Sequence, residues 1–236
     1  MAKRKRVRKG RKGILLGIIA LALAASLALV SASIGWKGII AKVEHLSATG
    51  SSPIEVSSAR VDPINEARDV RITGSLEIGK QPVDPQLSVT AKAAILFRHV
   101  EMYQWREQCS GADCRYDKLW SSLPIDSHGF RVQQGHENAK FPFTDAHFAA
   151  PDIKIGAFTI DPSLLLIKPA TQALPVTTTQ LPPNLAVTFG DADGVLYAGA
   201  DPAHAQIGAL RISYQISPLR TVTLVGVQRG ARLSRH

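Results

Sequence analysis

Residues 98–107 read RHVEMYQWRE and directly follow the apolar run AAILF at 93–97. Neither glycine nor proline interrupts residues 90–110, which favours one long extended segment. Side chains alternate between the two faces of a strand. One face would carry Ile95, Phe97, His99, Glu101, Tyr103 and Trp105, and the other Leu96, Arg98, Val100, Met102, Gln104 and Arg106. We expect both faces to be covered in the middle of the stretch, because neither is uniformly polar there. A helix is the alternative, since Met, Gln, Arg and Glu favour helices.

A turn-rich segment follows this stretch, and the only two cysteines of the chain, Cys109 and Cys114, flank it. Residues 114–120 have the pattern of a returning strand, so we expect a hairpin. The aromatic side chains expected to be neighbours across it are Tyr103, Trp105, Tyr116 and Trp120. In an extracytoplasmic domain, cysteines placed in this way indicate a disulfide. Two free thiols or part of a metal site are the alternatives, although structural zinc requires four ligands.

The positive charge of the chain is concentrated at its N-terminus. The formal net charge is +9, and residues 1–13 hold eight Lys and Arg and no acidic residue. The rest of the chain then has 20 basic and 19 acidic residues and is nearly neutral. Binding to nucleic acid requires basic residues spread over the folded domain. We therefore expect no nucleic-acid partner.

Residues 14–36 have the composition of a transmembrane helix. No charged residue occurs from 14 to 34, and such a helix would be about 31 Å long, enough to cross a hydrocarbon core of about 30 Å. Trp36 and Lys37 suit the far boundary, and the basic tail marks the cytoplasmic side. A cleaved signal peptide is the alternative, because residues 30–32 are small. However, the apolar run is longer than a signal core of about 7–15 residues.

These patterns divide the chain into four expected parts: a basic cytoplasmic tail (1–13), a transmembrane helix (14–36), a juxtamembrane linker (37–53) and a β-rich extracytoplasmic domain (54–236). Strand patterns occur at 70–78, 153–158, 185–189, 195–197, 210–216 and 221–228. A short helix is expected at 163–168, with Asp161 as its N-cap. The fold class is therefore a β-rich α+β extracytoplasmic domain preceded by one N-terminal transmembrane helix.

No motif for catalysis or for binding a metal or cofactor emerges. The residues that invite a metal hypothesis are His128, His136, Glu137, Asp145 and His147, but their spacing fits no ligand motif. Asp191 and Asp193 lack the further acids of a calcium loop. We therefore expect no catalytic residue, metal or cofactor. The alternative is an extracytoplasmic hydrolase or metal-dependent enzyme that uses His99, Glu101, His136 and Asp145.

Several segments of the chain, taken in order, resemble the transmembrane protein 43 family, also called LUMA. They are VDPINE (61–66), VRITG (70–74), residues 98–107, GHEN (135–138), residues 151–158, IGALRISY (207–214) and QRG (228–230). The residues that carry the resemblance are Arg98, His99, Glu101, Tyr103, Trp105, Gly135, His136, Asn138, Gly156, Arg211, Gln228 and Gly230. The chain departs from the family at Ala209 and Ala231, where acidic residues are expected. It also ends at His236, apparently without the family's C-terminal transmembrane helices.

The resemblance implies a non-enzymatic membrane protein. Such a protein would organise or scaffold membrane protein complexes through its extracytoplasmic domain and through self-association. Its implied partners are the lipid bilayer, other membrane proteins and a second copy of itself. The expected topology is single-pass with a cytoplasmic N-terminus. The membrane would be the inner membrane in a bacterium, and the endoplasmic reticulum or nuclear envelope in a eukaryote.

Overall fold

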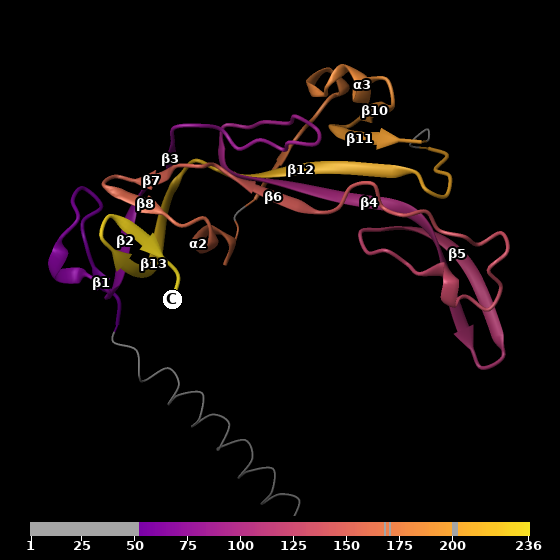
Figure 1. Cartoon of the computed structure of the whole chain (residues 1–236), viewed down its shortest axis with the longest axis horizontal. Helices are drawn as coiled ribbons and strands as arrows, with labels where there is room; N and C mark the ends of the chain where they lie inside the picture. The colour runs from indigo at the N-terminus through magenta and orange to yellow at the C-terminus, as the bar shows by residue number, and fades with distance from the viewer. Residues whose placement is uncertain (1–51, 168, 170, 200–202) are drawn as a thin grey trace, which may run out of the picture. The chain divides into compact units, whose positions relative to one another are not determined.

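The computed structural model describes residues 52–167, 169, 171–199 and 203–236 (Figure 1). Residues 53–236 form one compact unit that consists mainly of strands, as the sequence predicts. The predicted cytoplasmic tail, transmembrane helix and nearly all of the linker lie outside the described residues. Within the described ranges, no helix is long and apolar enough to span a bilayer.

One sheet is organised around the long strand β4 (Ala93–Ser110). Its order is β10 (Phe189–Ala192), β11 (Val195–Ala198), β12 (Leu210–Pro218), β4 and β5 (Asp113–Ser121). Two short strands, β6 (Ala146–Ala149) and β9 (Gln172–Leu174), pair with β4 and β12. All pairs in this sheet are antiparallel. In Figure 1, β12 lies along the first part of β4, and β5 returns along the second part.

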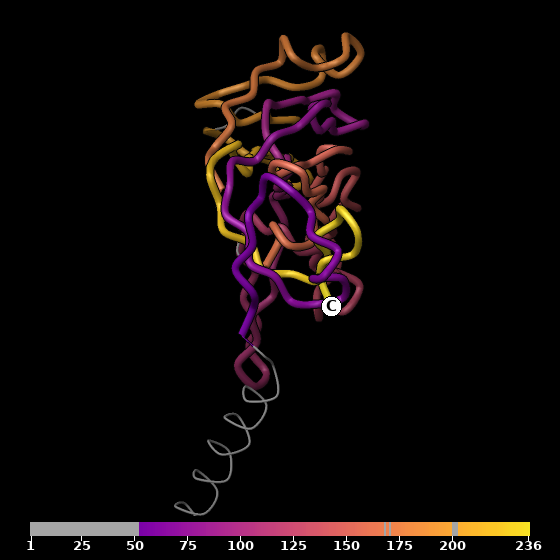
Figure 2. The backbone as a smooth tube through the Cα atoms, turned by 90° about the vertical axis from the view of Figure 1, so that its left-hand side faces the viewer, coloured from indigo at the N-terminus to yellow at the C-terminus, as the bar shows by residue number. Residues whose placement is uncertain are grey.

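The second sheet brings together segments from both ends of the compact unit. Its order is β1 (Ile54–Glu55), β2 (Asp69–Ser75), β13 (Thr221–Arg229), β14 (Arg232–Ser234), β8 (Phe158–Ile160), β7 (Ile153–Ile155) and β3 (Glu77–Ile78). β2 and β13 lie side by side although they are far apart in the sequence (Figures 1 and 2). The predicted strand at 221–228 is therefore confirmed, and it lies in the interior of the sheet.

In the described part of the chain, five short helical segments connect these strands: η1 (Pro63–Asn65), η2 (Ser127–Gly129), α2 (Ser163–Leu166), η3 (Thr178–Gln180) and α3 (Pro183–Ala186). The helix predicted at 163–168 is confirmed as α2, which ends at Leu166, but its N-cap is Pro162 and not Asp161 as predicted. Asp161 Oδ1 accepts a hydrogen bond from the Ser163 backbone N–H at 3.0 Å, so the aspartate satisfies a donor of the first turn.

The strand predicted at 185–189 is wrong in its first half. Residues up to Ala186 belong to α3, and the strand β10 begins only at Phe189. Pro183 occupies the first turn of α3, where a missing N–H costs nothing, and this start decides the local structure. The turn between β10 and β11 consists of Asp193 and Gly194, which have positive φ angles of 52° and 77°.

The central stretch is a strand, so the helix alternative is wrong. Its side chains contribute to two hydrophobic cores. Leu96, Val100 and Met102 are at most 1% exposed in one core, while Ala94 and Ile95 are fully buried in the other. The expectation that both faces are covered in the middle of the stretch is also wrong. From residue 97 to residue 104, one face is buried and the opposite face is exposed or half-buried, because the second core ends beside the start of β4.

Candidate binding surface

The buried face of β4 contains an ion pair in its middle. Arg98 and Asp84 have side chains that are 3% and 0% exposed, and Arg98 Nη1 donates to both Asp84 oxygens at 3.0 and 2.8 Å. The Tyr214 hydroxyl donates to Asp84 Oδ2 at 2.7 Å. Burial, together with this hydrogen bond, raises the pKa of Tyr214 well above its usual value.

The other two guanidinium nitrogens of Arg98 are also hydrogen-bonded. Nη2 binds Gln86 Oε1 at 2.7 Å and Nε binds the Thr144 carbonyl at 3.0 Å. A buried charge is tolerated only when it is paired and hydrogen-bonded, and this network meets both conditions. Arg98 therefore has a structural role. Residue types alone placed Arg98 on this face of the strand, but they did not identify Asp84 as its partner.

The opposite face of β4 begins with charged residues that reach solvent. Arg211, on β12, pairs with Glu101 through two hydrogen bonds, Nε to Oε2 at 2.6 Å and Nη2 to Oε1 at 2.9 Å. The bond to Glu101 raises the pKa of Arg211. His99 Nδ1 lies 3.1 Å from Asp145 Oδ2, and His99 Nε2 lies 3.9 Å from Glu101 Oε2. This end of the face is therefore a row of paired charges.

Aromatic rings continue this face toward β5. Tyr103 and Trp120 pack with their ring centroids 5.3 Å apart, as the predicted hairpin requires. The Arg211 guanidinium lies 4.7 Å from the Trp120 ring centroid, and the Lys118 ammonium lies 4.5 Å from that of Trp105. A cation held over an indole face is attracted by the ring quadrupole. We call Tyr103, Trp105, Lys118, Trp120 and Arg211 the aromatic–cationic face.

A loop after β5 covers the outer part of this face. His136 stacks on Tyr116 with a centroid distance of 3.9 Å and meets the edge of Trp105 at 4.7 Å. Asn138 accepts a hydrogen bond from the Trp105 backbone N–H at 2.7 Å and donates to the Trp105 carbonyl at 2.9 Å. The amide of Asn138 thus replaces a neighbouring strand where β12 has ended. Gly135 has a φ of 81°, which only glycine adopts without strain.

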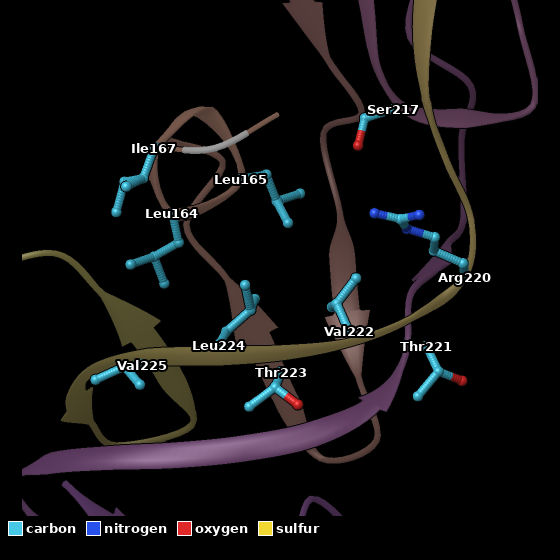
Figure 3. A pocket seen from close by; sticks show the side chains of 10 residues that line it. All are labelled: Leu164, Leu165, Ile167, Ser217, Arg220, Thr221, Val222, Thr223, Leu224 and Val225. Atoms are coloured by element: carbon cyan, nitrogen blue, oxygen red, sulfur yellow. The ribbon is translucent and has the colours of Figure 1, made fainter. Parts of the chain in front are cut away.

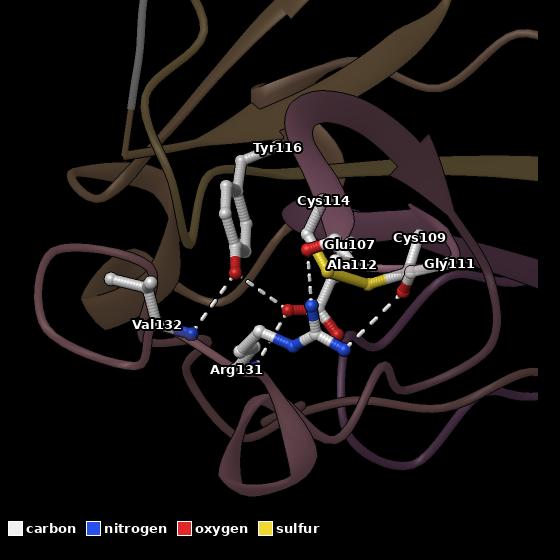
Figure 4. Close-up of a disulfide and its surroundings, with 8 residues drawn as sticks. All are labelled: Glu107, Cys109, Gly111, Ala112, Cys114, Tyr116, Arg131 and Val132. Atoms are coloured by element: carbon white, nitrogen blue, oxygen red, sulfur yellow. Dashed lines mark hydrogen bonds between the residues drawn. A yellow bond between two sulfur atoms is a disulfide. The ribbon is translucent and has the colours of Figure 1, made fainter.

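The tip of the hairpin contains a disulfide between Cys109 and Cys114, with Cα atoms 4.0 Å apart (Figure 4). Beside it, the Tyr116 hydroxyl donates to Glu107 at 2.6 Å, and this bond is the main cause of a lowered pKa for Glu107. The Arg131 guanidinium binds the carbonyl of Ala112 at the turn. In the described chain, one group of three potential metal ligands occurs, formed by Glu107 and the two cysteines. The disulfide removes both thiolates from it.

The other residues that carry the family resemblance lie in the second sheet, away from this face. Gln228 is fully buried, and its Nε2 donates to the Asp62 carbonyl at 2.7 Å. The Gly230 N–H donates to Glu66 at 2.8 Å. Gly156 has a φ of 56°, and a Cβ there would collide with the Ser58 carbonyl. These residues fasten the segment before β2 to the sheet.

The structure brings together three of the four residues of the enzyme hypothesis. His99, Glu101 and Asp145 are neighbours, beside an open groove of about 590 Å³. His136 instead contacts Trp105 and Tyr116. Trp105 is six positions along β4 from His99, or about 20 Å at the rise of a strand.

Among the described residues, no serine hydroxyl is hydrogen-bonded to His99. Ser213 lies opposite His99 on β12, but its hydroxyl makes no hydrogen bond to the imidazole within the described residues. A nucleophile needs a base within hydrogen-bond reach. His128 pairs with Asp126 at 2.9 Å, and His147 packs near Phe97 at 6.4 Å. The histidines and acids considered for a metal are therefore dispersed rather than convergent.

The fold and this face define a β-rich domain with an exposed aromatic and charged surface. The family model described as Transmembrane protein 43 matches residues 102–236, more than half of the chain. The chain therefore belongs to the transmembrane protein 43 family. The name of this family supports a membrane protein in general and does not describe an enzyme.

Curated relatives agree with this family. The chain is 29% identical to Transmembrane protein 43 of Homo sapiens over 244 residues, which covers 94% of this chain and 60% of the human protein. It is 29% identical to the Mus musculus protein, covering 77% and 50% of the two chains. The Drosophila melanogaster homolog is 27% identical and covers 40% and 29%. The chain thus spans about 60% of the length of the human relative. No solved structure matches.

Proposed function

We propose that this chain is a non-enzymatic membrane protein that organises membrane protein complexes, and that its aromatic–cationic face binds the partners. The observation that carries the proposal is the composition of this face. Trp, Tyr and Arg dominate the centres of protein interfaces, and here both Trp105 and Trp120 are half-buried on the surface beneath cations. A partner would complete the burial of these rings. Such a role requires no catalytic group.

The proposal includes where the face would operate. The basic tail and the apolar segment 14–36 support a bilayer-anchored chain with a cytoplasmic N-terminus. The domain would then lie outside the cytoplasm, in the lumen of the endoplasmic reticulum or nuclear envelope, or beyond a bacterial inner membrane. Its partners would be other membrane proteins and a second copy of this chain. Confinement to one membrane raises the effective concentration of such partners.

The test is Trp120→Ala in the full chain, expressed in native membranes. Chemical crosslinking followed by partner capture, with two differently tagged copies, would measure both partner binding and self-association. We expect at least a tenfold loss of crosslinked partners, since removing an interface tryptophan typically costs more than 1–2 kcal/mol. The matched control is Val187→Ala, an apolar residue that is 83% exposed in the turn between α3 and β10.

Two further results would decide whether the aromatic–cationic face is the binding surface. The Trp120→Ala protein must melt near the temperature of the parent, which separates lost binding from lost folding. If it is folded and still captures the same partners and its own copy, the aromatic–cationic face is not the binding surface. If only self-capture is lost, the face serves the second copy alone.

A further inference from the structure

A groove between α2 and β13 lies apart from the aromatic–cationic face. Its volume is about 520 Å³, within the range of about 300–1,000 Å³ typical of small-molecule sites. Leu165 and Ile167 form one wall, and Val222 and Leu224 form the other. Figure 3 shows the side chains of α2 on one side and those of β13 on the other. The walls are therefore aliphatic.

The groove leaves apolar side chains in contact with water. Ile167 is 56% exposed and Val225 is 41% exposed, although both are large aliphatic residues. A second hollow of about 340 Å³ shares Leu164, Ile167 and Val225 with the groove and continues past Gly226. Beyond the shared residues this hollow is lined by Asp69, Gly226, Arg235 and His236, so the apolar surface ends there. An aliphatic ligand lying along it would remove this surface from water.

One end of the groove is polar, and its side chains have no partner among the described residues. Ser217 is only 6% exposed, and its hydroxyl makes no hydrogen bond within the described residues. Arg220 is exposed, and its guanidinium has neither a hydrogen bond nor an ion pair in the same part of the chain. Figure 3 shows both side chains turned toward the groove. A hydroxyl and a guanidinium that face the groove without a partner in this part of the chain are available as donors to an acceptor on a ligand.

We propose that this groove binds one long-chain fatty acid. The carboxylate would lie at Arg220 and Ser217, and the acyl chain would lie between α2 and β13. A planar guanidinium matches the two oxygens of a carboxylate, and the hydroxyl supplies a further donor. The groove has two walls, one formed by the strand β13 and the other by α2, a helix of four residues. A single apolar groove of this kind suits one acyl chain rather than two.

The test uses the full chain in nanodiscs of zwitterionic lipid, with palmitic acid carrying a mid-chain diazirine as the probe. After photolysis, peptide mapping should find the label on residues 164–167 and 222–225. Arg220→Gln should reduce the labelling roughly three- to fivefold, the scale of an exposed charge-assisted contact. The matched control is Arg229→Gln, which removes an exposed cation from the same strand and should leave the labelling unchanged.

Competition separates a fatty acid from a general affinity for lipid. Unlabelled palmitate should displace the probe from the groove, whereas methyl palmitate, which has no charge, should displace it several-fold less well. The proposal is overturned if the label is confined to residues 14–36 or spread evenly over the domain. It is equally overturned if the ester competes as well as the acid while Arg220→Gln labels like the parent.

Discussion

At the scale of single residues, the strongest constraint is the buried pair of Arg98 and Asp84. Asp84→Ala would leave the guanidinium in the core without its counter-charge, because the Arg98 side chain is 3% exposed. We expect a loss of about 3–5 kcal/mol in the free energy of unfolding. Urea unfolding of the full chain in nanodiscs, followed by tryptophan fluorescence, would measure it.

The control for this prediction is Arg106→Gln. Arg106 also binds an aspartate, Asp117, at 2.6 Å, but both side chains are at least 40% exposed. Surface pairs contribute little, so this variant should unfold close to the parent. Equal unfolding midpoints for Asp84→Ala and Arg106→Gln would show that the buried network does not stabilise the domain.

A second prediction at the scale of single residues concerns how the stability contributed by Asp161 depends on pH. Asp161 accepts hydrogen bonds from Arg232 at 2.7 Å and from the Ser163 N–H at 3.0 Å, and these lower its pKa to about 2. A lowered pKa in the folded state means that the carboxylate stabilises the protein above a pH of about 4. This stabilisation is lost as the pH falls through about 2. Because Arg232 is 55% exposed, solvent screening reduces the contribution to about 1 kcal/mol.

Asp161→Asn should therefore melt at a lower temperature than the parent at pH 7, and the difference should shrink between pH 4 and pH 2. Melting curves of both proteins across this interval would test it. A difference that stays constant down to pH 2 would mean that the charge of Asp161 contributes nothing to stability.

At the scale of elements, the sequence predicted several strands and one helix from local patterns. The alternation along 93–110 predicted β4, and the turn residues between the cysteines predicted the return of β5. Pro162 and Asp161 likewise placed α2 within its predicted range. The local pattern at 185–189 predicted a strand where α3 ends and β10 begins, since an apolar run of five residues does not distinguish a strand from a helix.

Contacts between distant segments were not predictable in this way. Asp84 precedes a proline and has the sequence context of a turn, yet it is fully buried against Arg98. Asn138 has the composition of a loop, yet its amide hydrogen-bonds to the edge of β4. Both residues act through partners that only the assembled sheet brings near. The sequence predicted the aromatic–cationic face only in part: it placed Tyr103 and Trp105 on the same face of one strand, but it did not place Arg211 beside them.

Asn138 gives the element-scale prediction. Its amide takes the place of a strand on β4 through two hydrogen bonds to Trp105, at 2.7 and 2.9 Å. Asn138→Ala should leave these half-buried backbone groups unpaired, at a cost of about 1–3 kcal/mol. Hydrogen exchange at the Trp105 amide should accelerate markedly, while exchange in β13 should not change.

The control here is Gln134→Ala in the same loop, since Gln134 is exposed and has no hydrogen-bonded side chain within the described residues. It should exchange like the parent at Trp105. Unchanged exchange in Asn138→Ala would show that the loop is held by the stacking of His136 on Tyr116 instead.

At the scale of the whole molecule, the distribution of charge and the cysteines point to the same topology. Residues 1–13 hold eight basic residues and no acid, which favours retention in the cytoplasm. The disulfide at the hairpin tip is of a kind that persists in oxidising compartments and is rare in the cytosol. The two observations are independent, because one comes from the tail and the other from the domain.

We therefore expect the domain and the tail to be labelled from opposite sides of the membrane. Val187→Cys, at a position that is 83% exposed, should react with an impermeant maleimide only from the extracytoplasmic side. Lys5→Cys is the control and should react only from the cytoplasm.

In the parent, Cys109 and Cys114 should resist alkylation until a reductant is added, even after denaturation. Labelling of Val187→Cys from the cytoplasmic side alone would contradict the predicted topology and place the domain in the cytoplasm. Ready alkylation of both native cysteines without reductant would place the domain in a reducing compartment. The hairpin holds their Cα atoms 4.0 Å apart, so the two thiols are close enough to form a disulfide wherever the compartment is oxidising.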